Sequence, residues 1–132
     1  FNPEFKENVV LLYLNEKQDS KEGIAKFRES GRSFQKEITA VSEITEEFLK
    51  ANSVTDFNKL IIEHEQIISS IIKLQPVKEK LFSDYFGEVK SLGAWGGDFV
   101  LATSDRSADE TKRYFNEKGF EVFIKYEALI LP

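Results

Sequence analysis

The apolar positions of this chain follow two different spacings, and the changes of spacing divide it into strands and helices. The run from Val9 to Leu14 is apolar at every position, which is typical of a central strand covered on at least one face. A polar, turn-like stretch follows, and Ser20 can then cap a short helix that ends near Gly31, a residue type favoured just past a helix end. The N-terminal segment therefore predicts one strand and one helix.

Two long amphipathic helices are predicted in the middle of the chain, because apolar residues there lie three or four positions apart with charges between them. The first stripe lies between residues 34 and 52: Ile38, Val41, Ile44, Phe48 and Leu49. The second starts after Ser53 or Thr55 and closes before Pro76: Phe57, Leu60, Ile61, His64, Ile67, Ile68, Ile71 and Leu74. A short helical segment through Val77, Leu81 and Phe82 follows.

The pattern changes after Gly87. Residues 88–92 and 98–103 read as two strands on either side of a glycine-rich turn, which predicts an antiparallel hairpin. The sequence from Ser107 to Glu110 is a capping-box pattern that opens a helix, and Gly119 ends it. Residues 121–126 then alternate as a last half-buried strand.

The predicted order is strand, helices, strand, strand, helix, strand, which is the split βαβ arrangement. We therefore expect an α+β, ferredoxin-like fold, in which helices pack on one face of a four-stranded antiparallel sheet. Right-handed crossovers place the first strand in the middle, beside the third. A length of 132 residues fits one domain, residues 1–132, with a sizeable core.

Composition removes several classes of function. A net charge of −5 argues against binding to nucleic acid or to anionic membranes, and no apolar run approaches the roughly 20 residues that span a bilayer. The absence of cysteine excludes disulfides and thiolate chemistry and fits the cytoplasm. Methionine is also absent and the chain begins with Phe1, so we expect it to be a fragment of a longer protein.

The chain offers little for direct catalysis. Its only histidine is His64, and no G-x-S-x-G sequence is present to display a nucleophilic serine. His64 and Glu65 lack a second histidine at helical spacing, so no H-E-x-x-H zinc motif forms. We predict no catalytic residue and no metal ligand in this chain.

His64 has two interpretations. It lies on the apolar stripe, so it can be a core histidine whose nitrogens bond to backbone or water. Alternatively, the edge of the stripe lines a ligand cleft and presents His64 and Glu65 to it, since such sites are mostly apolar with a few placed polar groups.

The glycine-rich turn also has two interpretations. Gly93, Gly96 and Gly97 surround Trp95 between the two predicted strands. Glycines are common in tight hairpins and bulges. They also leave backbone N–H groups open to an anion such as phosphate, although the spacing matches neither the P-loop nor the dinucleotide fingerprint.

Three stretches resemble the GHMP small-molecule kinases, the superfamily of galactose, homoserine, mevalonate and phosphomevalonate kinases. KSLGAWGGDFVLAT, Lys90 to Thr103, resembles their third motif, which commonly reads K-x-T-G-A-G-G-G-G-x-V-x-A. VVLLYLNEKQDSKEGI, Val9 to Ile24, is similar to the start of their C-terminal domain, and IIEHEQIISSIIKLQPVKEKL, Ile61 to Leu81, to the helix before the motif. The chain looks closest to the GYDIA subgroup, over about Val9 to Leu131.

The resemblance implies a C-terminal domain that packs against an N-terminal kinase domain of the same polypeptide, with acceptor, ATP and Mg²⁺ between them. The loop that would face nucleotide and substrate comprises Gly93, Ala94, Trp95, Gly96, Gly97 and Asp98. Trp95 and Asp98 replace glycine or a small residue of the motif, which favours recognition of the acceptor over direct contact with phosphate. His64 and Glu65 fall near positions where related kinases offer polar groups to the acceptor.

The family's phosphate-binding loop, P-x-x-x-G-L-x-S-S-A, is absent from these 132 residues. We therefore expect the acceptor-side half of an ATP-dependent kinase, which is not catalytic alone and holds no cofactor tightly. Removal of the other half is expected to expose an apolar face, through which a homodimer can form. The alternatives are a stand-alone ferredoxin-like domain that binds a ligand or regulates, and a structural interaction domain with an ordinary hairpin.

Overall fold

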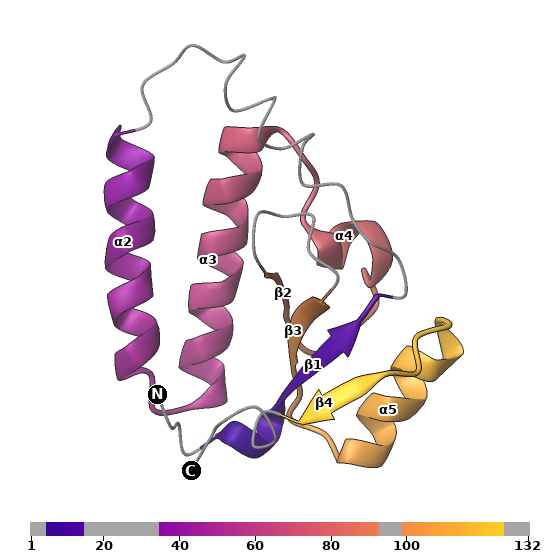
Figure 1. The fold of residues 1–132 in the computed structure, drawn as a ribbon. Helices are drawn as coiled ribbons and strands as arrows, with labels where there is room; N and C mark the ends of the chain where they lie inside the picture. Colours follow the sequence, from indigo (N-terminus) through magenta and orange to yellow (C-terminus); the bar gives the residue numbers. More distant parts are fainter. Residues whose placement is uncertain (1–4, 15–34, 93–98, 126–132) are drawn as a thin grey trace.

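The computed structural model describes residues 5–14, 35–92 and 99–125 (Figure 1). Its elements, in chain order, are η1 (Lys6–Asn8), β1 (Val9–Tyr13), α2 (Gln35–Lys50), α3 (Val54–Ile72), α4 (Val77–Leu81), β2 (Val89–Ser91), β3 (Phe99–Thr103), α5 (Ala108–Glu117) and β4 (Phe123–Lys125). The helix predicted from Ser20 and the glycine-rich turn lie outside the described residues. The other predicted strands and helices are present.

The four strands form one antiparallel sheet in the order β2-β3-β1-β4. The central strand β1 pairs with β3 on one side and β4 on the other, so that Leu11 lies opposite both Leu101 and Ile124. The α+β class, the antiparallel sheet and the place of the first strand beside the third are therefore confirmed.

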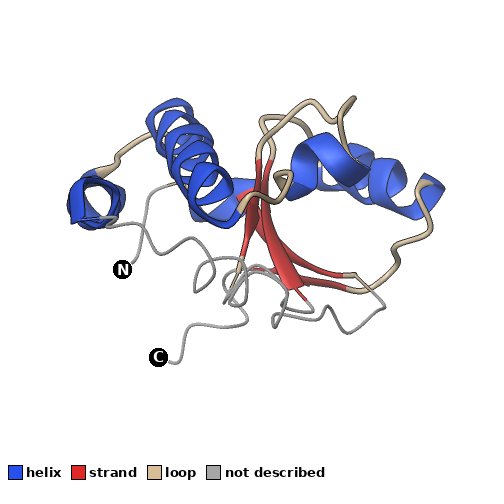
Figure 2. Ribbon diagram, turned by 90° about the horizontal axis from the view of Figure 1, so that it is seen from above, coloured by secondary structure: helices blue, strands red, loops and turns tan. Residues whose placement is uncertain are grey.

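The helices cover both faces of this sheet, which corrects the prediction that they share one face. Leu12 and its neighbours on one face pack against Phe115 of α5. Val9 and Leu101, which point to the opposite face, pack with Ile61 of α3. Figure 2 shows the two long helices on one side of the sheet and α4 with α5 on the other. The reason is that β1 is apolar at every position, so both of its faces must be covered.

Serine side chains cap the N-termini of α3 and α5, where the sequence predicts that these helices begin. The Ser53 hydroxyl accepts a hydrogen bond from the Asp56 N–H at 3.1 Å and starts α3. Ser107 caps α5 in the same way, accepting from the Glu110 N–H at 3.2 Å. These bonds satisfy N–H groups that have no partner within the helix. Gly119 follows α5 with a φ of 95°, a left-handed conformation that suits glycine.

Helix α2 packs on α3 rather than on the sheet, and Figure 1 shows α3 between α2 and the strands. Ile44 is the buried residue of α2. Ile38 and Leu49 are 50% and 65% exposed. The α2–α3 pair therefore presents apolar side chains on its outer surface.

Candidate functional site

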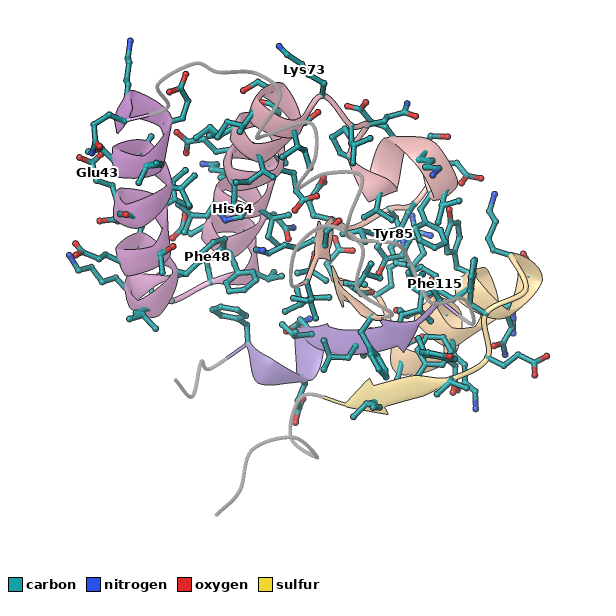
Figure 3. All side chains as sticks on the ribbon, turned by 45° about the horizontal axis from the view of Figure 1, so that its top comes forward. Glu43, Phe48, His64, Lys73, Tyr85 and Phe115 are labelled. Atoms are coloured by element: carbon teal, nitrogen blue, oxygen red, sulfur yellow. The ribbon has the colours of Figure 1, made fainter. Side chains whose placement is uncertain are left out.

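The two candidate residues of α3 point toward different neighbours. His64 lies at the boundary with α2, where its ring centroid is 6.2 Å from that of Phe48 (Figure 3). Its Nδ1 atom is buried and has no hydrogen-bond partner among the described residues. Burial, with a smaller effect of the Lys90 ammonium, lowers the pKa of His64 from 6.5 to about 4. The imidazole is therefore neutral at pH 7.

Glu65 faces the sheet and is 4% exposed. Its Oε1 accepts a hydrogen bond from the backbone N–H of Ser91 at 3.2 Å. Its Oε2 is buried, without a hydrogen-bond partner in the part of the chain that the structure describes. Burial raises the pKa of this carboxyl group from 4.5 to about 7, although Lys90 and the bonds from Ser91 act in the opposite direction. Glu65 therefore gains or loses its proton near neutral pH.

Lys90 is a further candidate residue of this site, which the sequence patterns do not single out. Its Nζ donates a hydrogen bond to the carbonyl oxygen of Ser91 at 3.1 Å. Burial lowers its pKa, and the Glu65 carboxylate offsets part of that effect. The available signal was strand alternation: Lys90 lies opposite Leu101, on the face that α3 covers, between residues that point to the other face.

Ser91 links these groups, because both of its backbone polar groups are bound by side chains. In an antiparallel pair, hydrogen-bonded and non-hydrogen-bonded positions alternate. The Thr103 N–H bonds to the Glu88 carbonyl oxygen at 2.9 Å, so the backbone groups of Ser91, three residues on, point away from β3. Edge groups of this kind normally remain open to pairing. Here the Ser91 N–H donates a hydrogen bond to Glu65, and the Ser91 carbonyl oxygen accepts one from Lys90.

We call His64, Glu65, Lys90 and the Ser91 backbone the α3–β2 polar cluster. Its chemistry combines a carboxyl group that exchanges a proton near pH 7, a neutral imidazole and a desolvated ammonium group. It can therefore hold a backbone segment and exchange one proton. Among residues 5–14, 35–92 and 99–125, no group of three or more His, Cys, Asp or Glu side chains is placed to hold a metal ion.

The predicted loop residues, Gly93, Ala94, Trp95, Gly96, Gly97 and Asp98, lie outside the described residues. The strands on either side of them are described. Ser91 lies opposite Val100 in an antiparallel pair, which confirms that the two strands are neighbours. The α3–β2 polar cluster therefore lies at the end of the strand that leads into this segment.

No helix of the described part is both long enough and apolar enough to cross a bilayer. No protein-family model, curated protein or solved structure matches this chain. The candidate site is thus defined by its own residues and their contacts.

Proposed function

We propose that this chain is the acceptor-side domain of an ATP-dependent small-molecule kinase of the GHMP type, in which a phosphoryl group passes from ATP to an alcohol or phosphate. The observation that carries the proposal is the position of the segment from Lys90 to Thr103, which resembles the third GHMP motif. It starts in β2 and ends in β3, within a sheet of order β2-β3-β1-β4. This split order is the one that the resemblance implies for a GHMP C-terminal domain.

The α3–β2 polar cluster supports an acceptor-side role. Lys90 and Ser91 lie just before the loop that the resemblance assigns to substrate, with Leu92 between, and Glu65 bonds to this strand end. His64 is the neighbour of Glu65 on α3, and the charge of Lys90 acts on it. Small-molecule sites combine apolar walls with a few placed polar groups. In the proposal, the loop from Gly93 to Asp98 contacts the acceptor, while His64 and Glu65 supply polar atoms behind it.

ATP, Mg²⁺ and the groups that stabilise the transferred phosphate belong, in this proposal, to an N-terminal domain of the same polypeptide. Phosphoryl transfer depends on positioning and charge around the γ-phosphate, and this chain contains no P-x-x-x-G-L-x-S-S-A segment to supply them. The net charge of −5 agrees with a small-molecule partner rather than nucleic acid or membrane. A cytoplasmic location, on the ground that cysteine is absent, is part of the same proposal.

The test is a phosphoryl-transfer assay on the product of the complete reading frame. ADP release is measured with a panel of small alcohols and phosphorylated alcohols. We expect release that depends on one acceptor class, and none from the 132-residue chain alone. Trp95→Ala is expected to raise the KM for the acceptor, whereas Lys112→Ala, at an exposed polar position of α5, serves as the control. A reading frame without the P-x-x-x-G-L-x-S-S-A segment contradicts the proposal.

A second candidate, a stand-alone ligand-binding or regulatory domain of ferredoxin-like fold, is favoured by one observation. The hydrogen bonds of the α3–β2 polar cluster join residues of this chain to one another. Calorimetric titration of the 132-residue chain separates the two candidates. The stand-alone domain binds a small molecule by itself, whereas the kinase half binds ATP and acceptors weakly or not at all.

A further inference from the structure

The end of β2 is held by two side chains of opposite charge. Ser91 donates its N–H to Glu65 Oε1 at 3.2 Å and accepts from Lys90 Nζ at 3.1 Å. The first contact joins residues that are 26 positions apart in the chain, so it fixes α3 to the strand. It is a contact to an ionisable acceptor, and such hydrogen bonds are stronger when the acceptor is charged.

The groups around Glu65 make this contact sensitive to one proton. From β2, Lys90 is the charged group that acts on the Glu65 carboxyl, and the Ser91 N–H is its hydrogen-bond donor. On α3 itself, the adjacent His64 is neutral because of its burial. The charge of Lys90 affects the pKa of both His64 and Glu65, although among the described residues Lys90 forms no ion pair with either within 4.0 Å. The second oxygen of Glu65, Oε2, has no hydrogen-bond partner among the described residues.

We propose that Glu65 is a positioning residue that holds the end of β2 through the Ser91 N–H, and that gain or loss of one proton on Glu65 changes the strength of this hold. In the ionised form, Oε1 is a charged acceptor and the bond to Ser91 is strong. In the protonated form, the carboxyl is a neutral acceptor and the bond is weaker. The loop that the proposed function assigns to substrate begins at Gly93, two residues after Ser91. The consequence for catalysis, though not the local effect, therefore rests on that proposed function.

The local effect is tested by NMR on the 132-residue chain between pH 5.5 and 8.5. The Ser91 amide proton is expected to move downfield as pH rises, with a midpoint near 7. The carboxyl carbon of Glu65, observed directly in protein labelled with ¹³C at glutamate, is expected to titrate with the same midpoint. The amide of Glu110, which bonds to the uncharged Ser107 hydroxyl, serves as an internal reference and should stay constant.

Two variants assign the effect to Glu65. Glu65→Gln keeps a hydrogen-bond acceptor of the same shape and removes the proton exchange, so the shift of the Ser91 amide with pH should disappear. Glu63→Gln changes an exposed glutamate two positions away and should leave the titration unchanged. The proposal is overturned if Glu65 titrates at its ordinary pKa, or if the Ser91 amide does not follow it. The titrations of the Glu65 carboxyl group and of the Ser91 amide use the unaltered chain, so they remain decisive if Glu65→Gln fails to fold.

The functional consequence is read from the complete polypeptide as the pH profile of KM for the acceptor and of kcat. We expect a change in KM with a midpoint near pH 7 that Glu65→Gln abolishes and Glu63→Gln keeps. If the Ser91 amide titrates but no acceptor is phosphorylated, the kinase proposal fails and the positioning role stands. If transfer occurs with a pH profile that Glu65→Gln does not alter, the role in catalysis fails and the kinase proposal stands.

Discussion

Gly87 lies so close to the carbonyl oxygen of Thr103 that no side chain fits between them. A Cβ atom added at Gly87 would be 1.9 Å from that oxygen and 2.9 Å from the ring of Tyr85. The same carbonyl accepts a hydrogen bond from the Tyr85 hydroxyl, and the Thr103 hydroxyl donates to Asn58 of α3 at 2.6 Å. Gly87 therefore lies where the entry to β2, the end of β3 and helix α3 meet.

Gly87→Ala is expected to destabilise the fold by about 2 kcal/mol or more, because the crowding atom is backbone and cannot rotate away. The measurement is the free energy of unfolding in urea. Gly119→Ala is the matched control, since a Cβ there meets nothing within 4 Å and only the φ of 95° is strained, which costs about 1 kcal/mol. An equal or larger loss from Gly119→Ala would contradict the close approach at Gly87.

Phe115 anchors the core on the α5 face of the sheet. It is fully buried, and its ring centroid lies 5.1 Å from that of Phe82 and 4.8 Å from that of Tyr85 (Figure 3). Phe115→Ala leaves a cavity and is expected to lower the free energy of unfolding by roughly 3–5 kcal/mol. Leu49→Ala, at a residue 65% exposed, is expected to change it by less than about 0.5 kcal/mol. Comparable losses from the two variants would mean that α2 has a covered outer face.

The sequence predicts the strands and helices well where periodicity and capping agree. Ser53 and Ser107 begin their helices, and the fully apolar run from Val9 indicates the central strand. The distribution of helices over the two faces could not be predicted from these patterns. Periodicity gives the apolar side of each element, and it does not give the face of the sheet on which a helix lies.

Only part of the candidate site could be predicted, because periodicity does not show which neighbour a helix residue meets. The apolar stripe predicted for α3 includes His64 and leaves out Glu65, yet Glu65 is the more buried of the two, at 4% exposed. It follows Phe57 and Ile61 at spacings of four, on the line of the helix that meets the sheet. A charged residue there becomes meaningful only once the edge of β2 lies opposite it, which a one-dimensional pattern does not contain.

Lys90 lowers the pKa of both Glu65 and His64. Its positive charge favours the ionised form of Glu65 and disfavours the protonated form of His64. Lys90→Met should therefore raise the pKa of Glu65 above about 7 and raise the pKa of His64 from about 4. Carbon-13 NMR of the carboxyl and imidazole groups measures both. Lys78→Met removes a lysine bound to Glu88 at 2.8 Å and should move neither. A fall in either pKa after Lys90→Met would show that the lysine is not oriented as described.

The pH dependence of stability contains two opposing contributions. His64 has a lowered pKa, so its contribution is present above pH 6.5 and is lost as pH falls toward 4. Glu65 has a raised pKa, so its contribution is present below pH 4.5 and is lost as pH rises through about 7. In the unaltered chain the two changes run in opposite directions over nearly the same interval and partly cancel.

Single variants should separate these contributions by sign. Glu65→Gln leaves the effect of His64, so the free energy of unfolding should rise between pH 4 and 6.5. His64→Gln leaves the effect of Glu65, so the free energy of unfolding should fall between pH 4.5 and 7. Each change is expected to be of the order of 1–3 kcal/mol. Urea unfolding at several pH values measures both slopes. The difference from the unaltered chain cancels the carboxylates common to all three proteins and leaves, with its sign reversed, the contribution that the substitution removed. Differences of the same sign in the two variants would contradict the opposite pKa shifts of His64 and Glu65.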